Sequence, residues 1–316
     1  MSVNPDQLPQ LEARLPFAAS FEPSFEPEMD SAVSVIIPAR NAAATLEDQL
    51  QALSRQTFTS WWEVIVVDNG SRDATMQIAQ SWHRRLPRLR VIHAPTVHGA
   101  AGARNAGARA ARGNLLLFCD ADDVVDPEWV TQLVKGLHNY PAVGGRIDRH
   151  SLNDPTAQAW RPARPADALP DHFGFLPYIQ GANCGVHRKL WSELGGFDEH
   201  FSHSEDVAFF WRVQLAGHEV GFVPDAVVCY RYRGSLSATA RQNFSYGKSH
   251  SQLYKQFASA GMPRSNPTLA LQEWGWLVIH ILHIVRSRQT RGAWLARAAR
   301  AAGRLAGCLH SRTLYL

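Results

Sequence analysis

Continuous apolar runs alternate with segments of helical spacing in the first part of the chain. The apolar runs cover residues 33–38, 63–68, 89–93 and 114–120. Segments in which apolar residues recur at helical spacing cover residues 43–53, 73–82 and 100–112. Runs that are apolar throughout are typical of strands buried on both faces. Their alternation with helices predicts a doubly wound α/β fold, in which helices flank a mostly parallel sheet.

The alternation continues less regularly as far as residue 233. We predict helices at 128–138 and 205–216, and strands at 142–148 and 219–223. A proline-rich loop at 154–170 and an irregular stretch at 179–187 separate these elements. We therefore assign residues 31–233 to one α/β domain.

Beyond residue 233 only helical spacing is visible, so we predict an α-helical C-terminal extension at 234–316. Its expected helices cover residues 240–259, 267–285 and 292–309. The middle helix contains an apolar stretch of 12 residues, at 274–285, with Glu273 at its edge. A helix that spans a bilayer needs about 20 apolar residues, so we do not expect this one to cross a membrane.

The composition is that of a globular protein. Among the 316 residues 45% are hydrophobic and 19% are charged, which excludes collagen-like, disordered and coiled-coil chains. Residues 1–30 hold six acids, five prolines and one arginine, and we expect a flexible acidic arm there without a signal peptide. The four cysteines lie far apart, which argues against a metal knuckle or a disulfide framework and favours the cytoplasm.

Charge is distributed unevenly along the chain. Residues 226–316 contain 13 lysines and arginines against one acid, whereas residues 1–225 contain 19 against 27. The extension is therefore a cationic module on an acidic body. Such modules are typical of proteins that meet nucleic acid, anionic lipid or a phosphorylated substrate.

Three polar clusters follow predicted strands, at residues 38–41, 68–71 and 120–122. In doubly wound sheets ligands bind at the carboxyl ends of the strands, so we expect these clusters to meet at one edge. Asp120 and Asp122 are two residues apart, which places both carboxylates on one side of an extended strand end. Paired carboxylates of this kind suit Mg²⁺ or Mn²⁺ shared with phosphate oxygens. The alternative is a solvated acidic turn before a helix capped by Asp126.

A second acidic pair, Glu205 and Asp206, begins a predicted helix. Residues 202–205 also fit a capping box, which would explain Glu205 but leaves Asp206 without a role. A carboxylate at this place could act as general base toward an acceptor hydroxyl.

The glycine-rich segment at 98–107 matches neither a dinucleotide-binding motif nor a P-loop. It either permits close helix packing or, through Arg104 near the helix start, binds an anion.

Seven segments in order resemble motifs of glycosyltransferase family 2, a large inverting family with the GT-A fold. They read SVIIPARN, VVDNGSRD, GAAGARNAG, LLLFCDADD, GANCGVHRKLWSELGGFDE, SEDVAFFWRVQLAG and VGFVPDAVVCYRYR. The resemblance covers about residues 33–233. It implies an enzyme that transfers a hexose-like sugar from a nucleotide-diphospho-sugar with inversion, in cell-surface polysaccharide or glycolipid assembly, and that uses Mg²⁺ or Mn²⁺.

The resemblance also implies roles for individual residues. On the donor side the base pocket would be formed by Pro38, Ala39 and Asn41. Asp68 would bond the imide of a uracil-type base, Arg104 would steady the nucleotide, and Asp120 would meet the ribose and the metal. Asp122 would bind the metal and Asp206 would be the base. The acceptor and diphosphate side would include Gly181, Asn183, Asp198, Glu205, Arg231 and Arg233.

One departure from the family pattern concerns the segment after the last core strand. Many members carry a histidine there that contacts the metal or the diphosphate, whereas this chain reads CYRYR at 229–233. Arg231 or Arg233 would bind the diphosphate instead. A catalytically silent binding or assembly protein of the same fold therefore stays an alternative. A nucleotidyltransferase is a further one, although the chain lacks the basic glycine-rich signature of that class after Val33.

The last predicted helix is amphipathic. Its apolar stripe consists of Trp294, Leu295, Ala298, Ala302, Leu305 and Leu309, and its flank carries Arg297, Arg300 and Arg304. This pattern is typical of a helix that lies on anionic lipid, with Trp274 and Trp276 as further anchors. The alternative is a helical pair packed on the catalytic domain with its arginines in solvent.

No aromatic and basic sheet motif accompanies the charge, so we do not expect nucleic acid as a partner. We expect a UDP-sugar donor, a lipid-linked or saccharide acceptor, and a peripheral position on the cytoplasmic face of a membrane.

Overall fold

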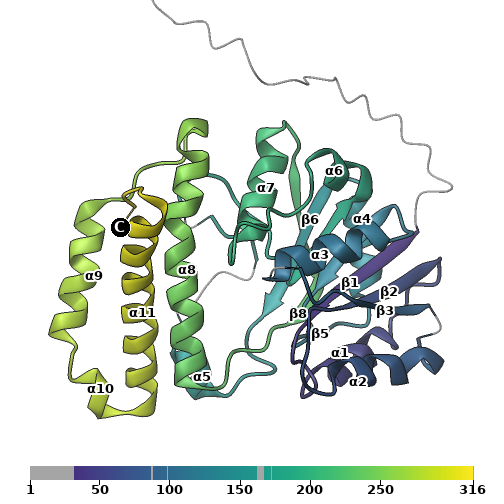
Figure 1. The fold of residues 1–316 in the computed structure, drawn as a ribbon, viewed down its shortest axis with the longest axis horizontal. Coiled ribbons are helices and arrows are strands. Elements are labelled where there is room, and N and C mark those ends of the chain that lie inside the picture. The colour runs from purple at the N-terminus through teal and green to yellow at the C-terminus, as the bar shows by residue number, and fades with distance from the viewer. Residues whose placement is uncertain (1–31, 87, 98, 162–166, 172, 316) are drawn as a thin grey trace, which may run out of the picture. The chain divides into compact units, whose positions relative to one another are not determined.

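The centre of the molecule is one mixed sheet. The computed structural model describes residues 32–315 except 87, 98, 162–166 and 172, so the predicted acidic arm at 1–30 lies outside the described residues. Over the described residues eight strands pair in the order β3-β2-β1-β4-β7-β6-β8-β5 (Figure 1). They are β1 (Val33–Ala39), β2 (Trp62–Asp68), β3 (Leu89–His93), β4 (Leu115–Cys119), β5 (Val124–Val125), β6 (Ala142–Asp148), β7 (Asn183–His187) and β8 (Val220–Cys229).

The first four strands of the chain form the parallel half of the sheet. β1 pairs in parallel with β2 and β4, and β2 pairs in parallel with β3. Alternate residues of β1 enter two different hydrophobic clusters, Val35 and Ile37 on one face and Ile36 on the other. Burial on both faces is the reason that these strands are apolar throughout, and the predicted parallel arrangement is confirmed.

The other half of the sheet is mixed. β7 lies antiparallel between β4 and β6, β8 runs parallel to β6, and the short β5 pairs antiparallel with β8. The prediction of an irregular stretch at 179–187 is wrong for its second part, which is β7. Small residues hide this strand from the pattern, because a Cβ at Gly185 would lie 2.8 Å from Cδ2 of Leu117 on β4. The strand predicted at 219–223 continues to Cys229, where it supports β5.

Helices cover both faces of the sheet. They are α1 (Leu46–Leu53), α2 (Thr75–Ser81), α3 (Gly99–Ala110), α4 (Trp129–Leu137), α5 (Pro155–Ala159), α6 (Arg188–Glu193) and α7 (Glu205–Leu215), with a 3₁₀ turn η1 (Trp82–Arg84). Buried residues of α1, α2 and α4 share one hydrophobic cluster, and those of α3, α6 and α7 share the other. The start of α3 and the start of α7 thereby reach the edge where β1 and β4 end.

The C-terminal extension is a group of helices beside the sheet (Figure 1). It consists of α8 (Leu236–Phe257), η2 (Ala258–Ala260), α9 (Pro267–Ile279), α10 (His283–Arg286) and α11 (Arg288–Ser311). The single helix predicted at 267–285 is therefore wrong, since the chain breaks at His280 and turns through α10. Ser287 then starts α11 with a capping box that Thr290 completes. This turn lets α11 run back between α9 and α8.

Glycines set the packing of α8 on α11. A Cβ at Gly247 would lie 2.1 Å from the carbonyl oxygen of Arg300, and one at Gly303 would lie 2.1 Å from that of Phe244. The two backbones can approach this closely only because neither glycine carries a side chain. None of the described helices combines the length and the apolar character that a membrane-spanning helix needs.

A third hydrophobic cluster joins the extension to the α/β part. Trp211 and Phe201 from the region of α7 pack with Leu253 and Phe257 of α8 and with Tyr315. The described residues form one compact unit. The boundary that we predicted at 233/234 falls between the end of β8 and the start of α8.

Candidate active site

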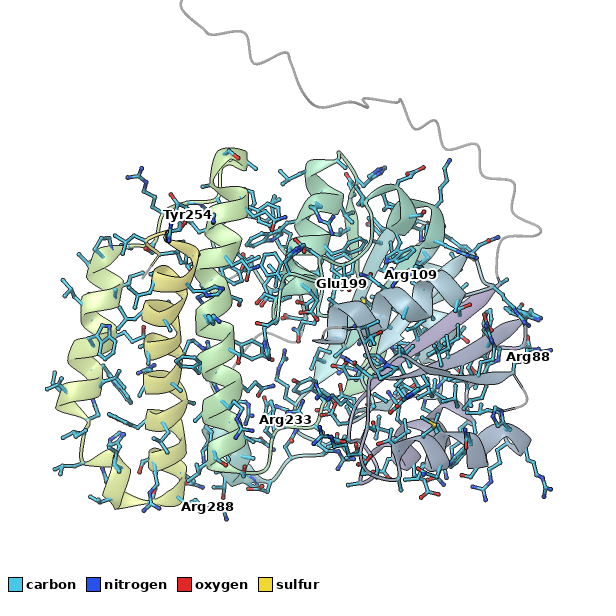
Figure 2. The ribbon with its side chains drawn as sticks, in the orientation of Figure 1. Arg88, Arg109, Glu199, Arg233, Tyr254 and Arg288 are labelled. Atoms are coloured by element: carbon cyan, nitrogen blue, oxygen red, sulfur yellow. The ribbon has the colours of Figure 1, made fainter. Side chains whose placement is uncertain are left out.

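A cavity of about 810 Å³ lies at the carboxyl ends of β1 and β4. Ten residues singled out in the sequence line it: Pro38, Ala39, Asn41, Arg104, Asp120, Asp122, Glu205, Asp206, Arg231 and Arg233. The same cavity is bordered by residues of α8 and α11, so the C-terminal extension forms part of its wall. Arg233 marks this region in Figure 2, between α8 and the strands.

Arg104 joins the two acidic motifs. Its Nη2 donates to Oδ1 of Asp120 at 2.7 Å, and its Nη1 donates to Oε1 of Glu205 at 2.6 Å. The side chain is 4% exposed. Burial alone would lower the pKa of Arg104, but the charges of Asp120 and Glu205 outweigh it and raise that pKa above its usual range. Arg104 therefore stays charged and ties the strand end to α7.

Glu205 is held by this ion pair and not by a capping box. The N-cap of α7 is Ser204, whose side chain makes no capping bond, so the capping-box alternative fails. Burial raises the pKa of Glu205 to about 7, although Arg104 acts in the opposite direction. Burying a carboxylate costs free energy, and Glu205 contributes no capping bond to α7 that would offset it. Its place is therefore explained by the ion pair with Arg104 and not by the start of the helix.

Asp206 lies on the first turn of α7 and faces the cavity. Its Oδ2 accepts a hydrogen bond of 2.8 Å from the backbone N–H of Gly181, and its Oδ1 accepts one of 2.8 Å from Val207. Ser204 precedes the acidic pair with a φ of 66°, a left-handed conformation that costs free energy in a residue other than glycine. The hydroxyl of Ser204 bonds to that of Ser249 on α8 at 2.7 Å. The extension thus holds the strained residue next to Asp206.

A third aspartate, Asp123, joins the predicted pair Asp120 and Asp122 in an acidic cluster. The sequence pattern did not predict a role for Asp123. Carboxylate oxygens of Asp120, Asp122 and Asp123 lie within 4.8 Å of one another. Burial, and after it the charge of Asp120, raises the pKa of both Asp122 and Asp123. Oδ2 of Asp123 is buried without a hydrogen-bond partner among the described residues. Crowded carboxylates with an unused buried oxygen fit a divalent cation. The sequence signal for Asp123 was its place directly after the DxD pair.

The alternative of a solvated acidic turn agrees with the structure only in part. Glu128 is the N-cap of α4, and Oδ1 of Asp126 accepts a hydrogen bond of 3.0 Å from the Glu128 amide, so Asp126 caps the turn that leads into the helix. The turn is not solvated throughout, since Asp123 is fully buried.

Arg231 and Arg233 both bind the acidic cluster. Nη1 of Arg233 lies 2.7 Å from Oδ2 of Asp122. The Arg231 amide donates to Oδ1 of Asp123 at 2.7 Å, and its Nη2 donates to Oδ2 of Asp48 at 2.8 Å. The segment that departs from the family pattern therefore delivers one guanidinium group, that of Arg233, to a carboxylate of the cluster, while the Arg231 guanidinium binds Asp48 and the backbone carbonyl oxygen of Asp122.

Four of the expected residues do not line the cavity. Asp68 is fully buried, with Oδ2 3.0 Å from Nδ1 of His93. Asn183 lies in the core, where it accepts from Nε1 of Trp129 and donates to the carbonyl oxygens of Arg146 and Ala226. Asp198 bonds to His200. Gly181 acts through its backbone, and a Cβ there would lie 2.9 Å from Cζ of Arg104.

Sequence comparison now identifies the family. The model of glycosyl transferase family 2 matches residues 34–193, about half of the chain, and that of glycosyl transferase family group 2 matches residues 115–296. The chain belongs to glycosyltransferase family 2. Glycosyltransferase GlyG of Streptococcus pneumoniae is 31% identical over 230 residues, which cover 67% of this chain and 74% of GlyG. Glycosyltransferase AglE of Haloferax volcanii is 28% identical over 225 residues, 70% of this chain and 74% of AglE. EpsH of Bacillus subtilis is 34% identical over 231 residues, which cover 67% of this chain and 63% of EpsH.

Solved structures share the GT-A fold with this chain. The mannosyltransferase PcManGT from Pyrobaculum calidifontis, solved with GDP-Man and Mn²⁺, aligns over 92% of this chain and 91% of its own with a TM-score of 0.59 and 21% identity. TarS 1–349 of S. aureus, solved with UDP, aligns over 90% of this chain and 93% of its own with a TM-score of 0.52 and 17% identity. The predicted family and fold are confirmed.

Proposed function

We propose that this glycosyltransferase transfers a sugar from a UDP-sugar to an acceptor hydroxyl with inversion at the anomeric carbon. The observation that carries the proposal is that Asp206 borders the same cavity as Asp120 and Asp122, and that Arg104 joins Asp120 to Glu205, the neighbour of Asp206 in the chain. A cavity of about 810 Å³ has room for a nucleotide-sugar. Nucleotide-sugars in the structures of PcManGT and TarS support a donor of this class.

Donor binding would use the ends of β1, β2 and β4. Pro38, Ala39 and Asn41 would line the base pocket. Asp68, which is fully buried and does not line the cavity, would only position this pocket, by accepting a hydrogen bond of 3.3 Å from the Ser71 amide. Asn41 is held in position by two hydrogen bonds. Its backbone N–H donates to Oγ of Ser71, and its side-chain Oδ1 accepts from the backbone N–H of Arg72. Mg²⁺ or Mn²⁺, held by Asp120 and Asp122 with Asp123, would neutralise the diphosphate leaving group. Arg231 and Arg233 would contact the phosphate oxygens.

Asp206 would take the proton of the acceptor hydroxyl while that oxygen attacks the anomeric carbon from the face opposite the diphosphate. Two backbone N–H groups fix this carboxylate, so it does not need to reorganise during the reaction. Gly181 positions both Asp206 and Arg104. Asn183 and Asp198 would act only by shaping the acceptor side, since neither lines the cavity.

The acceptor would be lipid-linked or a saccharide in polysaccharide or glycolipid assembly, at an anionic membrane on the cytoplasmic face. An apolar stripe on α9 and α10 supports the membrane contact: Leu271, Trp274, Val278, Leu282 and Val285 are all exposed. Ile279 beside it is 78% exposed. Arg286 and Arg288 are exposed at its end, so the stripe combines apolar area with positive charge.

The face predicted on α11 is largely used inside the protein. Nε1 of Trp294 donates to the carbonyl oxygen of Leu277 at 2.9 Å, Arg297 lies 4.1 Å from the Trp276 ring centroid, and Arg304 pairs with Glu273. Of the predicted stripe, Leu305 and Leu309 are exposed. Arg297 and Arg304 are likewise engaged within the protein, in contrast both to the lipid-facing flank that we expected and to the arginines in solvent of the alternative.

Vesicle sedimentation tests the membrane contact. The full chain should bind phosphatidylglycerol vesicles at low salt and lose binding when Val278 and Leu282 are both changed to serine. Leu309→Ser is the matched control on α11 and should keep binding. The reverse outcome would assign the contact to α11, and a wild-type chain that ignores anionic vesicles would disprove the membrane contact without affecting the reaction.

The reaction itself is tested with a panel of nucleotide-sugars. We expect the full chain to hydrolyse a UDP-sugar slowly in Mn²⁺ or Mg²⁺ and to stop in EDTA. NMR of the transfer product should show the anomeric configuration opposite to that of the donor. Turnover of none of the donors in either metal would favour a catalytically silent protein.

A further inference from the structure

The cavity has a second wall, formed by the C-terminal helices and the loops beside them. It includes Arg161 directly after α5, Gln242, Asn243 and Tyr246 on α8, and Arg300 on α11. The four carboxylates among the described lining residues, Asp120, Asp122, Glu205 and Asp206, belong instead to β4, its following turn and α7. Arg104, Arg231 and Arg233 offset these carboxylates on their own side, whereas none of the carboxylates among the described lining residues lies on the second wall.

Two guanidinium groups of this wall meet at one turn of α8. Nη2 of Arg300 donates to Oδ1 of Asn243 at 2.7 Å. Nη2 of Arg161 lies 3.4 Å from both Oγ1 of Thr239 and Oε1 of Gln242. The glycine contacts between α8 and α11 bring Arg300 to this turn, because Gly247 packs directly on the Arg300 backbone. Two cations from distant parts of the sequence are thus placed beside neighbouring residues.

Arg161 is packed in a way that preorganises it for an anion. Its Cζ lies 3.9 Å from the centroid of the Tyr232 ring. Burial lowers the pKa of Arg161, which means that its charge is partly removed from water. Planar guanidinium groups that stack on aromatic rings and lose water are typical of sites that bind phosphate through paired hydrogen bonds.

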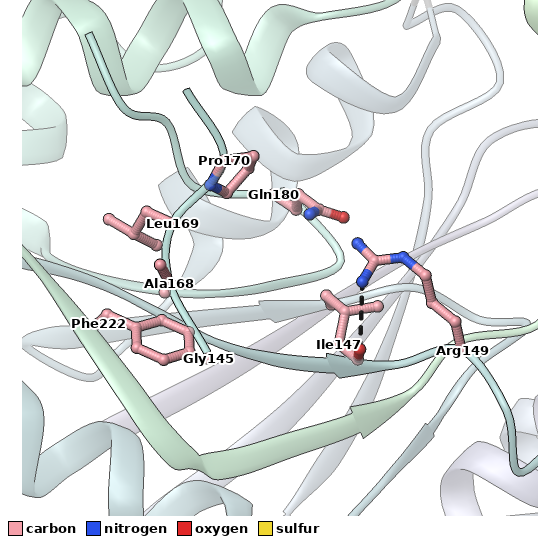
Figure 3. A pocket seen from close by; sticks show the side chains of 9 residues that line it. Gly145, Ile147, Arg149, Ala168, Leu169, Pro170, Gln180 and Phe222 are labelled. Atoms are coloured by element: carbon pink, nitrogen blue, oxygen red, sulfur yellow. Dashed lines mark hydrogen bonds between the residues drawn. The ribbon is translucent and has the colours of Figure 1, made fainter. Parts of the chain in front are cut away.

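A third arginine borders the same wall from the end of β6. Nη1 of Arg149 donates to the carbonyl oxygen of Ile147 at 3.3 Å, and the guanidinium extends toward Gln180 (Figure 3). Both Arg149 and Gln180 line the large cavity and also a smaller hollow of about 20 Å³ next to it. Three guanidinium groups from β6, the following loop and α11 therefore border one side of the site.

We propose that this wall binds a phosphate ester of the acceptor, with Arg161 and Arg300 as its principal ligands and Arg149 at its margin. The proposal rests on the function proposed above and names the class of its acceptor. Within this wall Tyr246 faces the side of the proposed catalytic base, since its ring contacts that of His203, three residues before Asp206, with centroids 5.6 Å apart. An acceptor held at the arginines by its phosphate would extend a hydroxyl past Tyr246 toward Asp206.

Calorimetric titration of the full chain tests the site. The probes are inorganic phosphate, glucose 1-phosphate as a soluble sugar phosphate, and decyl phosphate below its critical micelle concentration as a lipid phosphate. The first series is run in EDTA, which removes metal contacts to phosphate, and the second with saturating UDP and Mg²⁺. We expect binding that weakens with salt and persists beside UDP. Tighter binding of decyl phosphate or of glucose 1-phosphate would identify the lipid or the soluble source.

Arg161→Gln and Arg300→Gln should each weaken phosphate binding roughly tenfold or more, because each removes a charge-assisted hydrogen bond. Arg297→Gln, one turn before Arg300 on the same helix, is the matched control and should bind as wild type. Arg161→Lys and Arg300→Lys keep the charge and should retain part of the affinity, which separates loss of the ligand from loss of folding.

Failure of all three probes to bind, or equal affinity in the glutamine variants, would overturn the proposal. Loss of phosphate binding in the presence of UDP would also overturn it, because the arginines would then serve the donor diphosphate. A chain that binds phosphate but neither UDP nor any nucleotide-sugar would instead contradict the proposed donor.

Discussion

The backbone N–H of Gly181 donates a hydrogen bond of 2.8 Å to Oδ2 of Asp206. This bond joins the segment that leads into β7 to the first turn of α7, two regions 25 residues apart in the chain. The same glycine lies against the guanidinium of Arg104. One residue without a side chain therefore contacts both the proposed base and the arginine that binds the first aspartate of the DxD motif.

Replacing Asp206 by asparagine should leave donor affinity unchanged and lower turnover by about 10²–10⁴-fold. The amide keeps the shape but has one acceptor oxygen, so it retains one of the two backbone hydrogen bonds and cannot take a proton from the acceptor. Steady-state kinetics with the active UDP-sugar measures the loss. Asp225→Asn, an exposed acid on β8, is the control and should behave as wild type. A D206N variant with more than about half of the wild-type rate would leave Asp206 without a catalytic role.

Asp122→Ala should abolish metal-dependent donor binding and leave the fold intact. The residue lies at a strand end on the cavity and not in the hydrophobic core, and its loss removes one carboxylate from the acidic cluster. Calorimetry in Mn²⁺ and in EDTA measures the metal dependence, and circular dichroism checks the fold. Asp225→Ala serves as the control. Unchanged metal dependence in D122A would refute the assignment of the DxD motif.

Gly181→Ala should reduce turnover more than it reduces stability. A Cβ would lie 2.9 Å from Cζ and 3.0 Å from Nη2 of Arg104, so the guanidinium or the loop must shift, and with it Asp206. Small displacements of a catalytic group cost on the order of 10²-fold in rate. Gly275→Ala on α9 is the matched control, because its Cβ would meet no atom within 4 Å. Equal kcat values for the two variants would contradict this role of Gly181.

Glu205 should make stability depend on pH. Because burial raises the pKa of Glu205 to about 7 from its usual value of 4.5, the native state binds a proton more tightly than the unfolded chain does. Its contribution is fully present below about pH 4.5 and is lost as the pH rises through 7. Relative to Glu205→Gln, the free energy of unfolding of the wild type should therefore fall by on the order of 1–3 kcal/mol between these values. Urea unfolding of both proteins across this range measures it, and parallel profiles would show that Glu205 is not buried as described.

Local patterns were sufficient to predict the parallel half of the sheet and, in the mixed half, β6 and the first part of β8, but not β5 or β7. Val33 to Ala39 and Leu115 to Cys119 are buried on both faces, so their apolar character is visible without knowledge of their partners. β7 instead contains Asn183 and Gly185, which are required by Trp129 and Leu117 on other elements. The sequence around such residues shows no strand pattern, because these residue types are set by contacts with residues that are distant along the chain.

The sequence by itself determined the parallel strands, the acidic motifs that follow them and the family to which those motifs belong, because each depends on residues close together in the chain. Only the tertiary structure decided that Arg104 joins Asp120 to Glu205, that Asp123 completes the acidic cluster, and that Arg300 reaches the cavity. These relationships depend on how α3, α7, α8 and α11 pack. Glycine contacts and buried ion pairs fix that packing, and their partners are separated by tens to more than a hundred residues.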